Sequence, residues 1–412
     1  MLEKKFVPKK RFERFKDNES WQEIKLGENA IIKGRLGWKS LKREEYIDYG
    51  PSMIAGKHIK NGIINWNEVD HIPLWRYEES PEIMLKNGDV IFSKDGSLGN
   101  PALITDLKDK ATINATMMLV RTNKNLIPSY FYQILNSKQF HDLVYLKVSG
   151  SSIPHLFQED MKNFRFYAPP VNEQQKIGEF FKVLDERIAN QERKIAKVKA
   201  LKTAYLTEMF PQEGEIVPKR RFKGFTEEWK YRKLSDLTEL YVGNSFSSDI
   251  NNKGKYVVMD MGSVSQEGYR LKQKRTNLKR DILNKDDLVM PKDDIGGGQI
   301  IGKTAHINKN NSYVLGDHVF RLRFFDNEGL FMHYHINSKP INLSLKKKVT
   351  GSAQLGIKSI NVLNQYITIP TIEEQQKIGS FFKNLDDQIA TEEKKLEKLK
   401  KMKEAYLEEM FV

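Results

Sequence analysis

The chain has 412 residues, a formal net charge of +14 at pH 7 and no cysteine. The lack of cysteine excludes a disulfide framework, a cysteine nucleophile and a cysteine zinc site. The N-terminal segment is charged and has no apolar signal-peptide core, and no run of about 18 apolar residues occurs, so we expect a cytoplasmic protein without a membrane span.

The first 170 residues are long enough for a globular domain with its own core. They open with the sequence VPKKRFERF from Val7 to Phe15. The segment 88–106 has short apolar runs divided by Gly and Pro, which is typical of strands and turns. The segment 130–140 is predicted to be a helix. A basic strand and a loop of small residues, LKVSGSSIPHL from Leu146, are predicted to follow it.

The segment 171–212 predicts a long helix. Pro170 ends the preceding strand, and the carboxylate of Glu173 favours a helix N-terminus. Polar Gln191 and Lys202 interrupt an apolar stripe, and they either fix its register or extend to water. The apolar residues recur in alternating steps of four and three, as in a coiled-coil seam, and they are Ile177, Phe181, Leu184, Ile188, Ile195, Val198, Tyr205 and Met209.

The segment 213–370 repeats the organisation of the first segment. The opening sequence is repeated as VPKRRFKGF from Val217 to Phe225. The segment 286–308 corresponds to 88–106, and the segment 330–340 is again predicted to be a helix. A basic strand and a loop of small residues, KKKVTGSAQLGI from Lys346, are again predicted to follow. The rest of the two segments has diverged, so we expect two α+β domains with a shared frame and different surfaces.

The segment 371–412 repeats the first long helix at a constant offset of 201 residues, with roughly two-thirds of positions identical. A long internal repeat of this kind defines the architecture. The equivalent of Gln191 is Glu392, and that of Lys202 is Lys403. The second seam contains Ile378, Phe382, Leu385, Ile389, Leu396, Leu399, Tyr406 and Met410.

A helix with such a stripe cannot bury it alone, so the two long helices are predicted to pair within the chain. An antiparallel pair relates the two halves by a pseudo-two-fold axis and places one domain at each end of a rod, whereas a parallel pair crowds both domains at one end. We favour the antiparallel coiled coil. The alternative is that each helix folds back on its own domain or mediates homodimers.

The positive charge lies outside the long helices. Residues 171–212 contain 8 Lys or Arg and 6 Asp or Glu, and residues 371–412 contain 8 and 10. The excess therefore belongs to the two globular segments, which indicates a polyanionic partner. Membrane headgroups would favour a basic amphipathic helix, and solubility alone is a further alternative.

The small-residue loops are the main candidates for contact with a nucleic acid. Little side chain hinders the approach of their backbone N–H groups to phosphate oxygens, and neighbouring lysines add attraction. In the first half the candidates are Lys94, Lys147, Ser149, Gly150, Ser151, Ser152 and His155. In the second half they are Lys292, Gln299, Lys303, Lys346, Lys347, Lys348, Thr350, Gly351, Ser352 and Gln354.

The sequence GGQIIGKT, from Gly297 to Thr304, matches the phosphate-binding P-loop pattern. That pattern needs a helix after it, whereas AHINKNNSYVL favours a strand and a hairpin. In the first half, Asn100 and Pro101 stand where Lys303 and Thr304 would be. Nucleotide binding is therefore not expected.

Searches for catalytic motifs give no candidate. APP at 168–170 lacks the Asn or Asp of an amino-methyltransferase motif, and PKDD at 291–294 has no matching E-x-K strand of a two-metal nuclease. His333 and His335 do not share a helix face as an i, i+4 metal pair would. We therefore expect no catalytic residue, no metal site and no cofactor in this chain.

The openings and the long helices together resemble the specificity subunits of type I restriction-modification systems. The resemblance rests on P-K-x-R-F-x-x-F followed by Trp and Lys-Leu, and on Pro followed by E-Q-x-K-I, each present twice and in the family's order. It implies that 1–170 and 213–370 are target recognition domains, and that 171–212 and 371–412 are spacer helices.

The same resemblance implies the partners. They are double-stranded DNA, two modification subunits that bind S-adenosylmethionine and methylate adenine, and two restriction subunits that use ATP and magnesium. Each domain would read one half of a bipartite, asymmetric target, and the rod would set the unread spacing. The alternatives are an ATPase or nuclease in its own right, or a coiled-coil transcriptional regulator.

Overall fold

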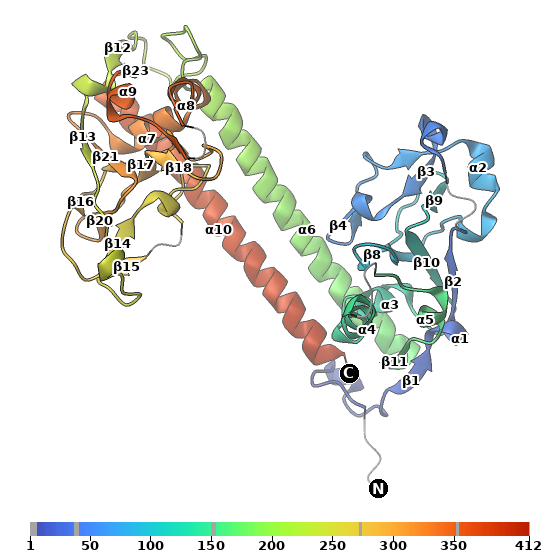
Figure 1. Cartoon of the computed structure of the whole chain (residues 1–412). Helices are drawn as coiled ribbons and strands as arrows, with labels where there is room; N and C mark the ends of the chain where they lie inside the picture. The colour runs from blue at the N-terminus through green and yellow to red at the C-terminus, as the bar shows by residue number, and fades with distance from the viewer. Residues whose placement is uncertain (1–5, 37–40, 150–153, 272–273, 352–353, 412) are drawn as a thin grey trace. The chain divides into compact units, whose positions relative to one another are not determined.

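The computed structural model describes residues 6–36, 41–149, 154–271, 274–351 and 354–411. The chain forms two compact units (Figure 1). Unit 1 comprises residues 1–192 and 395–412, and unit 2 comprises residues 193–394. Each unit therefore combines one globular segment with parts of two long helices, α6 (Val171–Glu208) and α10 (Ile372–Met410).

Unit 1 is built on a four-stranded antiparallel sheet in the order β2-β10-β7-β8. A second sheet has the order β6-β3-β9, and β1-β11 and β4-β5 form pairs. The strands are β1 Gln22–Lys25, β2 Ala30–Gly34, β3 Ile47–Ile54, β4 Ile59–Lys60, β5 Ile63–Ile64, β6 Asp70–His71, β7 Val90–Ser93, β8 Gly99–Leu103, β9 Ala111–Ile113, β10 Met117–Thr122 and β11 Arg165–Ala168. The shorter helices are α1 Leu26–Asn29, α2 Leu74–Glu78, α3 Pro128–Ile134, α4 Lys138–Ser149 and α5 Gln158–Lys162.

Unit 2 has a four-stranded sheet in the order β13-β21-β17-β19. A second sheet has the order β15-β14-β20-β16, and β12-β23 and β18-β22 form pairs. The strands are β12 Lys230–Lys233, β13 Thr238–Val242, β14 Tyr256–Met259, β15 Arg275–Thr276, β16 Ile282–Leu283, β17 Leu288–Pro291, β18 Asp293–Asp294, β19 Ala305–His306, β20 Tyr313–Leu315, β21 Val319–Phe324, β22 Leu355–Gly356 and β23 Tyr366–Ile369. The shorter helices are α7 Gly329–Asn337, α8 Lys339–Lys346 and α9 Ser359–Leu363.

The two globular parts share the strand order of their four-stranded central sheets. In both, the opening strand pairs with the strand that precedes the long helix, as β1 with β11 and β12 with β23. Each contains one parallel pair, β3 with β9 and β14 with β20. The predicted α+β architecture with two related domains is confirmed.

The ends of the long helices and the residues that directly follow them complete the core of each unit. In unit 1, Phe411 packs against Trp21, Tyr130 and Phe181. In unit 2, Phe210 packs in the same manner against Trp229, Phe331 and Phe382. The helices therefore belong to the folded domains and are not external attachments.

The long helices pair antiparallel, as the sequence predicts. In unit 1, Asp185 of α6 pairs with Lys403 of α10, and Glu192 pairs with Lys400. In unit 2, Lys202 pairs with Asp386, and Lys194 with Glu392. Rising numbers in one helix meet falling numbers in the other, which defines the direction. The sixteen predicted seam residues are all buried or half-buried.

Two local predictions are wrong. Leu146 to Ser149 form the last turn of α4 and not a basic strand. The basic strand predicted from Lys346 is also absent, because Lys346 ends α8 and a turn follows it. The predicted helix over 130–140 is two helices, α3 and α4, and 330–340 is divided in the same way between α7 and α8. In the second case the break is explained by Pro340, which has no N–H to continue a helix but fits the first turn of a new one.

No helix within the described residues is long and apolar enough to cross a membrane.

Candidate nucleic-acid interface

The central strands β7 and β17 each end at a Lys-Asp pair held in the same backbone environment. The N–H of Lys94 donates to the carbonyl of Thr116 at 2.9 Å, and its own carbonyl accepts from Leu156 at 2.9 Å. The N–H of Lys292 donates to the carbonyl of His318 at 3.0 Å. Its carbonyl accepts from the N–H of Ile357 at 2.8 Å, so Lys94 and Lys292 occupy equivalent places.

A histidine joins each pair. In unit 1, Lys94 Nζ lies 2.6 Å from Asp95 Oδ2, and His155 Nδ1 contacts Asp95 Oδ1. In unit 2, His318 Nδ1 lies 2.8 Å from Asp293 Oδ2, and Lys292 Nζ lies 3.6 Å from the same oxygen. We call these groups the unit 1 cluster (Lys94, Asp95 and His155) and the unit 2 cluster (Lys292, Asp293 and His318).

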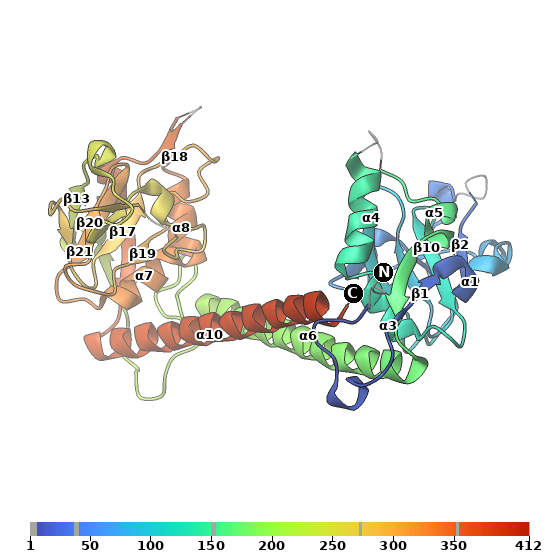
Figure 2. The same ribbon diagram turned by 90° about the horizontal axis from the view of Figure 1, so that it is seen from below.

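The elements beside the two clusters differ. In unit 1 the C-terminal end of α4 points away from α6, and in unit 2 the strand β18 lies on the side away from α10 (Figure 2). Strand β18 forms a short ribbon with β22, and Thr350 pairs with Gly356 beside it. The side chains of Gln299, Thr350 and Gln354 are exposed at this ribbon. Gly351 has φ +113°, a conformation that suits only glycine.

Several of the predicted lysine contacts point elsewhere. Lys147 Nζ forms an ion pair with Asp160 at 2.7 Å, and Lys347 Nζ lies 3.5 Å from Glu213. Lys348 Nζ donates to Gln365 at 2.8 Å, and burial lowers its pKa. Lys346 is half-buried at the end of α8.

Lys303 also turns inward. Its Nζ donates to the carbonyl of Asn337 at 3.2 Å. Burial, with the charge of Lys346 nearby, lowers the pKa of Lys303 to about 8. Lys303 is therefore half-buried, and a backbone carbonyl already accepts a hydrogen bond from its amine.

The loop that matches the P-loop pattern is organised around a carboxylate. Asp294 Oδ1 accepts the N–H of Gly296 at 2.7 Å, and Asp294 Oδ2 accepts the N–H of Ile300 at 3.2 Å. The Asp294 carboxylate already accepts hydrogen bonds from these two N–H groups, so they are not available to bind a phosphate. Thr304 is followed by strand β19 as predicted, although β19 pairs with β17 and not with the next strand.

Some predicted contacts lie outside the described residues. These are Gly150, Ser151, Ser152 and Ser352. The side chain of Ser149 is also outside the description. Within the described residues, no three His, Asp or Glu side chains gather as ligands for a metal ion. His333 and His335 are buried in α7, and burial lowers the pKa of His335 to about 3.

A family model described as the type I restriction modification DNA specificity domain matches residues 18–200 and again residues 226–401. The two matches cover most of the chain. The chain belongs to this family. It is thus the DNA specificity subunit of a type I restriction-modification system, and the specificity subunit is the non-catalytic member of such a system.

Relatives of the specificity family align over nearly the full length. The chain is 24% identical to the type I restriction enzyme MjaVIII specificity subunit of Methanocaldococcus jannaschii over 407 residues, covering 93% of this chain and 90% of the relative. The crystal structure of the S subunit from M. genitalium is 16% identical, with a TM-score of 0.66 over 98% of this chain and 99% of that one. A structure from a study of type I R-M complex assembly is 20% identical, with a TM-score of 0.52 over 94% and 96%. These structural matches show the fold.

The specificity subunit also contains a buried ion pair that joins each opening to a long helix. Arg11 forms two hydrogen bonds with Glu173, and Arg221 does the same with Glu374. From the sequence, Glu173 is expected only to favour a helix N-terminus, and its partner Arg11 is not predicted. The available signal was that the opening and the helix are repeated together.

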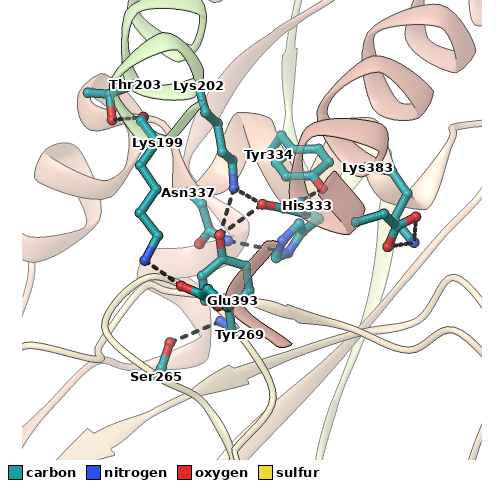
Figure 3. Close-up of polar contacts among 12 residues, drawn as sticks. Lys199, Lys202, Thr203, Ser265, Tyr269, His333, Tyr334, Asn337, Lys383 and Glu393 are labelled. Carbon is teal, nitrogen blue, oxygen red and sulfur yellow. Dashed lines mark hydrogen bonds and ion pairs between the residues drawn. The ribbon is translucent and has the colours of Figure 1, made fainter. Parts of the chain in front are cut away.

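A second, partly buried group joins the helix pair in unit 2. Lys202 Nζ lies 2.5 Å from Asp386 Oδ1, and Tyr269 and Tyr334 donate to the same carboxylate at 2.8 and 2.6 Å. Lys202, Tyr269 and Tyr334 converge from a long helix, a loop and α7 (Figure 3). Lys202, predicted from sequence either to set register or to extend to water, is thus held in an ion pair.

Proposed function

We propose that this specificity subunit recognises a bipartite, asymmetric sequence in duplex DNA. In this proposal residues 1–170 and 213–370 are two target recognition domains, each reading one half of the sequence. Residues 171–212 and 371–412 are the spacer helices. The observation that supports the proposal is that β7 and β17 end in equivalent Lys-Asp pairs, while the elements around them differ.

The distribution of charge along the chain supports the globular segments as the DNA-binding parts. The net positive charge belongs to the globular segments, and neutralising phosphates releases counterions. The unit 1 cluster and the unit 2 cluster with its ribbon are proposed to approach the bases. Exposed Gln299, Thr350 and Gln354 can hydrogen-bond to base edges or phosphates. Lys303 and Lys348 are proposed to be structural residues instead.

The proposed partners are those that the family implies. Two modification subunits would carry S-adenosylmethionine and methylate adenine, and two restriction subunits would use ATP and magnesium. This chain would hold none of these cofactors and would act as their scaffold. A study of complex assembly describes one related structure, which supports a role in an assembly. The proposed location is the cytoplasm.

The test is the adenine-methylation pattern of cells with and without the gene for this chain, measured by methylome sequencing. The proposal expects one bipartite motif to lose methylation when the gene is deleted and to regain it on complementation. Deletion that leaves every bipartite motif methylated would contradict the proposal. If the chain were instead an ATPase or a nuclease in its own right, the purified chain would hydrolyse ATP or cut DNA by itself.

A further inference from the structure

We infer that Asp95 and Asp293 are base-reading residues. In this assignment each carboxylate accepts a hydrogen bond from the exocyclic amino group of a cytosine or an adenine in the major groove. The lysine and histidine of each cluster act as positioning residues that hold the carboxylate. The inference rests on the proposed function and names a specificity-determining contact for each half-site.

The two clusters are assembled from different chain positions. At the repeat offset of 201 residues, the equivalent of His155 is Gly356. A Cβ atom at Gly356 would lie 2.8 Å from Asp293 Oδ1, so a side chain at that position would displace the carboxylate from the place it has here. The unit 2 histidine comes instead from His318, whose backbone place corresponds to Thr116 of unit 1.

The same grouping has therefore arisen by two routes. Divergence of the domains changed which residue supplies the imidazole, yet each aspartate kept both a lysine and a histidine. Packing alone does not require this result, because the side chains of Asp95 and Asp293 remain 30% and 20% exposed. A carboxylate that faces water needs no protein partner to be stable.

Each carboxylate keeps the capacity to accept another hydrogen bond. An ionised carboxylate has about four acceptor sites on its two oxygens. In unit 1 the lysine and the histidine occupy two of them, and in unit 2 the histidine occupies one. The exposed fraction of each side chain gives access to the remainder. An aspartate is a suitable reader because the amino group of cytosine presents a donor that a carboxylate accepts.

The charge balance of each cluster suits an approach to DNA. A lone carboxylate would be repelled by the phosphates, whereas the adjacent lysine cancels its charge. The histidine adds a polar group without adding negative charge. The cluster can thus approach the duplex, while the lysine and the histidine keep the carboxylate in a fixed orientation.

An exposed apolar side chain contacts the unit 1 cluster, and another follows the unit 2 cluster closely along the chain. The ring of Phe157 lies 4.3 Å from that of His155 and is 59% exposed, and Ile295, two residues after Asp293, is 72% exposed. Large apolar groups held in water beside a polar reader suit contact with a thymine methyl group or the edge of a base. These neighbours would exclude water from the carboxylate contact.

The test is methylome sequencing of cells in which the full chain, with its modification subunits, carries Asp95→Asn or Asp293→Asn. Asparagine keeps the shape but also presents a donor, so we expect each variant to change one base position in one half of the motif. The discrimination at that base should fall by roughly 5- to 150-fold. The other half-site should remain as in the wild type.

Matched controls make the same chemical change away from the clusters. One control is Asp326→Asn, and Asp326 lies in an exposed bend after β21. The other is Glu159→Gln, in which Glu159 loses the negative charge of its exposed ion pair with Lys162 in α5. Both are expected to keep the wild-type motif. An unchanged motif in both cluster variants overturns the inference, and a wild type with no bipartite motif overturns the proposed function instead.

A second substitution keeps the test decisive if an asparagine variant does not fold. If an asparagine variant gives no methylation and shows lower thermal stability than the wild type, Asp293→Glu retains the charge and moves the carboxylate. We expect Asp293→Glu to alter the same base position. Retention of the wild-type motif by a folded Asp293→Glu variant would overturn the assignment in unit 2.

Discussion

The guanidinium of Arg11 donates two hydrogen bonds to the carboxylate of Glu173, from Nε to Oε1 at 2.7 Å and from Nη2 to Oε2 at 2.6 Å. The side chains are 4% and 1% exposed. Arg221 and Glu374 form the same bidentate pair in unit 2, at 13% and 0%. The opening of each half and the start of each long helix are therefore one structural element, which explains why they are repeated as a set.

Arg11→Ala should destabilise unit 1 strongly, because it leaves the buried charge of Glu173 without its partner. We expect a loss of about 3–5 kcal/mol in the free energy of unfolding, measured by urea denaturation of the full chain. The neighbouring Lys10→Ala is the control, since the Lys10 pair with Glu409 is about half exposed and should contribute about 0–1 kcal/mol. Equal effects of the two substitutions would contradict the assignment.

Asp386→Asn should weaken the helix pair in unit 2. The carboxylate accepts hydrogen bonds from Lys202, Tyr269 and Tyr334. Charged hydrogen bonds in a partly buried site contribute more to stability than exposed ones do. A loss of about 2–4 kcal/mol is expected by the same denaturation assay. Asp387→Asn changes the adjacent residue, whose ion pair with Lys383 is exposed, and should change stability by about 0.5 kcal/mol or less.

Phe411→Ala should unfold the core of unit 1 more readily, because the ring packs against Trp21, Tyr130 and Phe181. Removal of a buried phenyl ring typically costs about 3–5 kcal/mol. Phe325→Ala removes an exposed ring and is expected to have little effect. A thermal unfolding curve for Phe411→Ala that overlays the wild type would show that the end of α10 does not stabilise unit 1.

Lys303 gives the chain a predictable pH dependence. Burial lowers its pKa to about 8 from an ordinary value of 10.5, so the folded state carries an unfavourable charge below pH 8. Between pH 8 and 10.5 the unfolded chain binds more protons than the folded one, and the stability contributed by this residue therefore rises with pH.

Lys303→Met should remove that rise. We expect the variant to be more stable than the wild type at pH 7 by about 1–3 kcal/mol, with the difference vanishing toward pH 10.5. Urea denaturation across this range measures it. A difference between variant and wild type that does not change with pH would contradict the buried position of Lys303. The methylation motif of Lys303→Met should match the wild type.

The sequence predicts the frame of this protein well because the frame is repetitive. A stripe at helical spacing, such as Ile177, Phe181 and Leu184, has few ways to be buried, and its second copy at an offset of 201 supplies the partner. The polar interruptions at Lys202 and Lys403 are visible in the pattern. Their carboxylate partners, Asp386 and Asp185, appear only when the two helices are aligned in space.

The candidate contact surface is much less predictable. Lys147, Lys303 and Lys348 look alike in sequence, yet each is held by a neighbour that lies far along the chain or in another element. The role of His318 could not be predicted, because its partner Asp293 is 25 residues away and the first half uses a different position. Tertiary contacts decide which charges remain available, and local sequence does not contain them.

The central claim is that the two globular segments read different halves of one target. Its most direct measurement is the methylome of cells whose chain carries residues 217–370 from a related specificity subunit of different target. We predict a hybrid motif in which one half is replaced, while the other half and the spacing are kept. A motif that changes in both halves, or in neither, would contradict it.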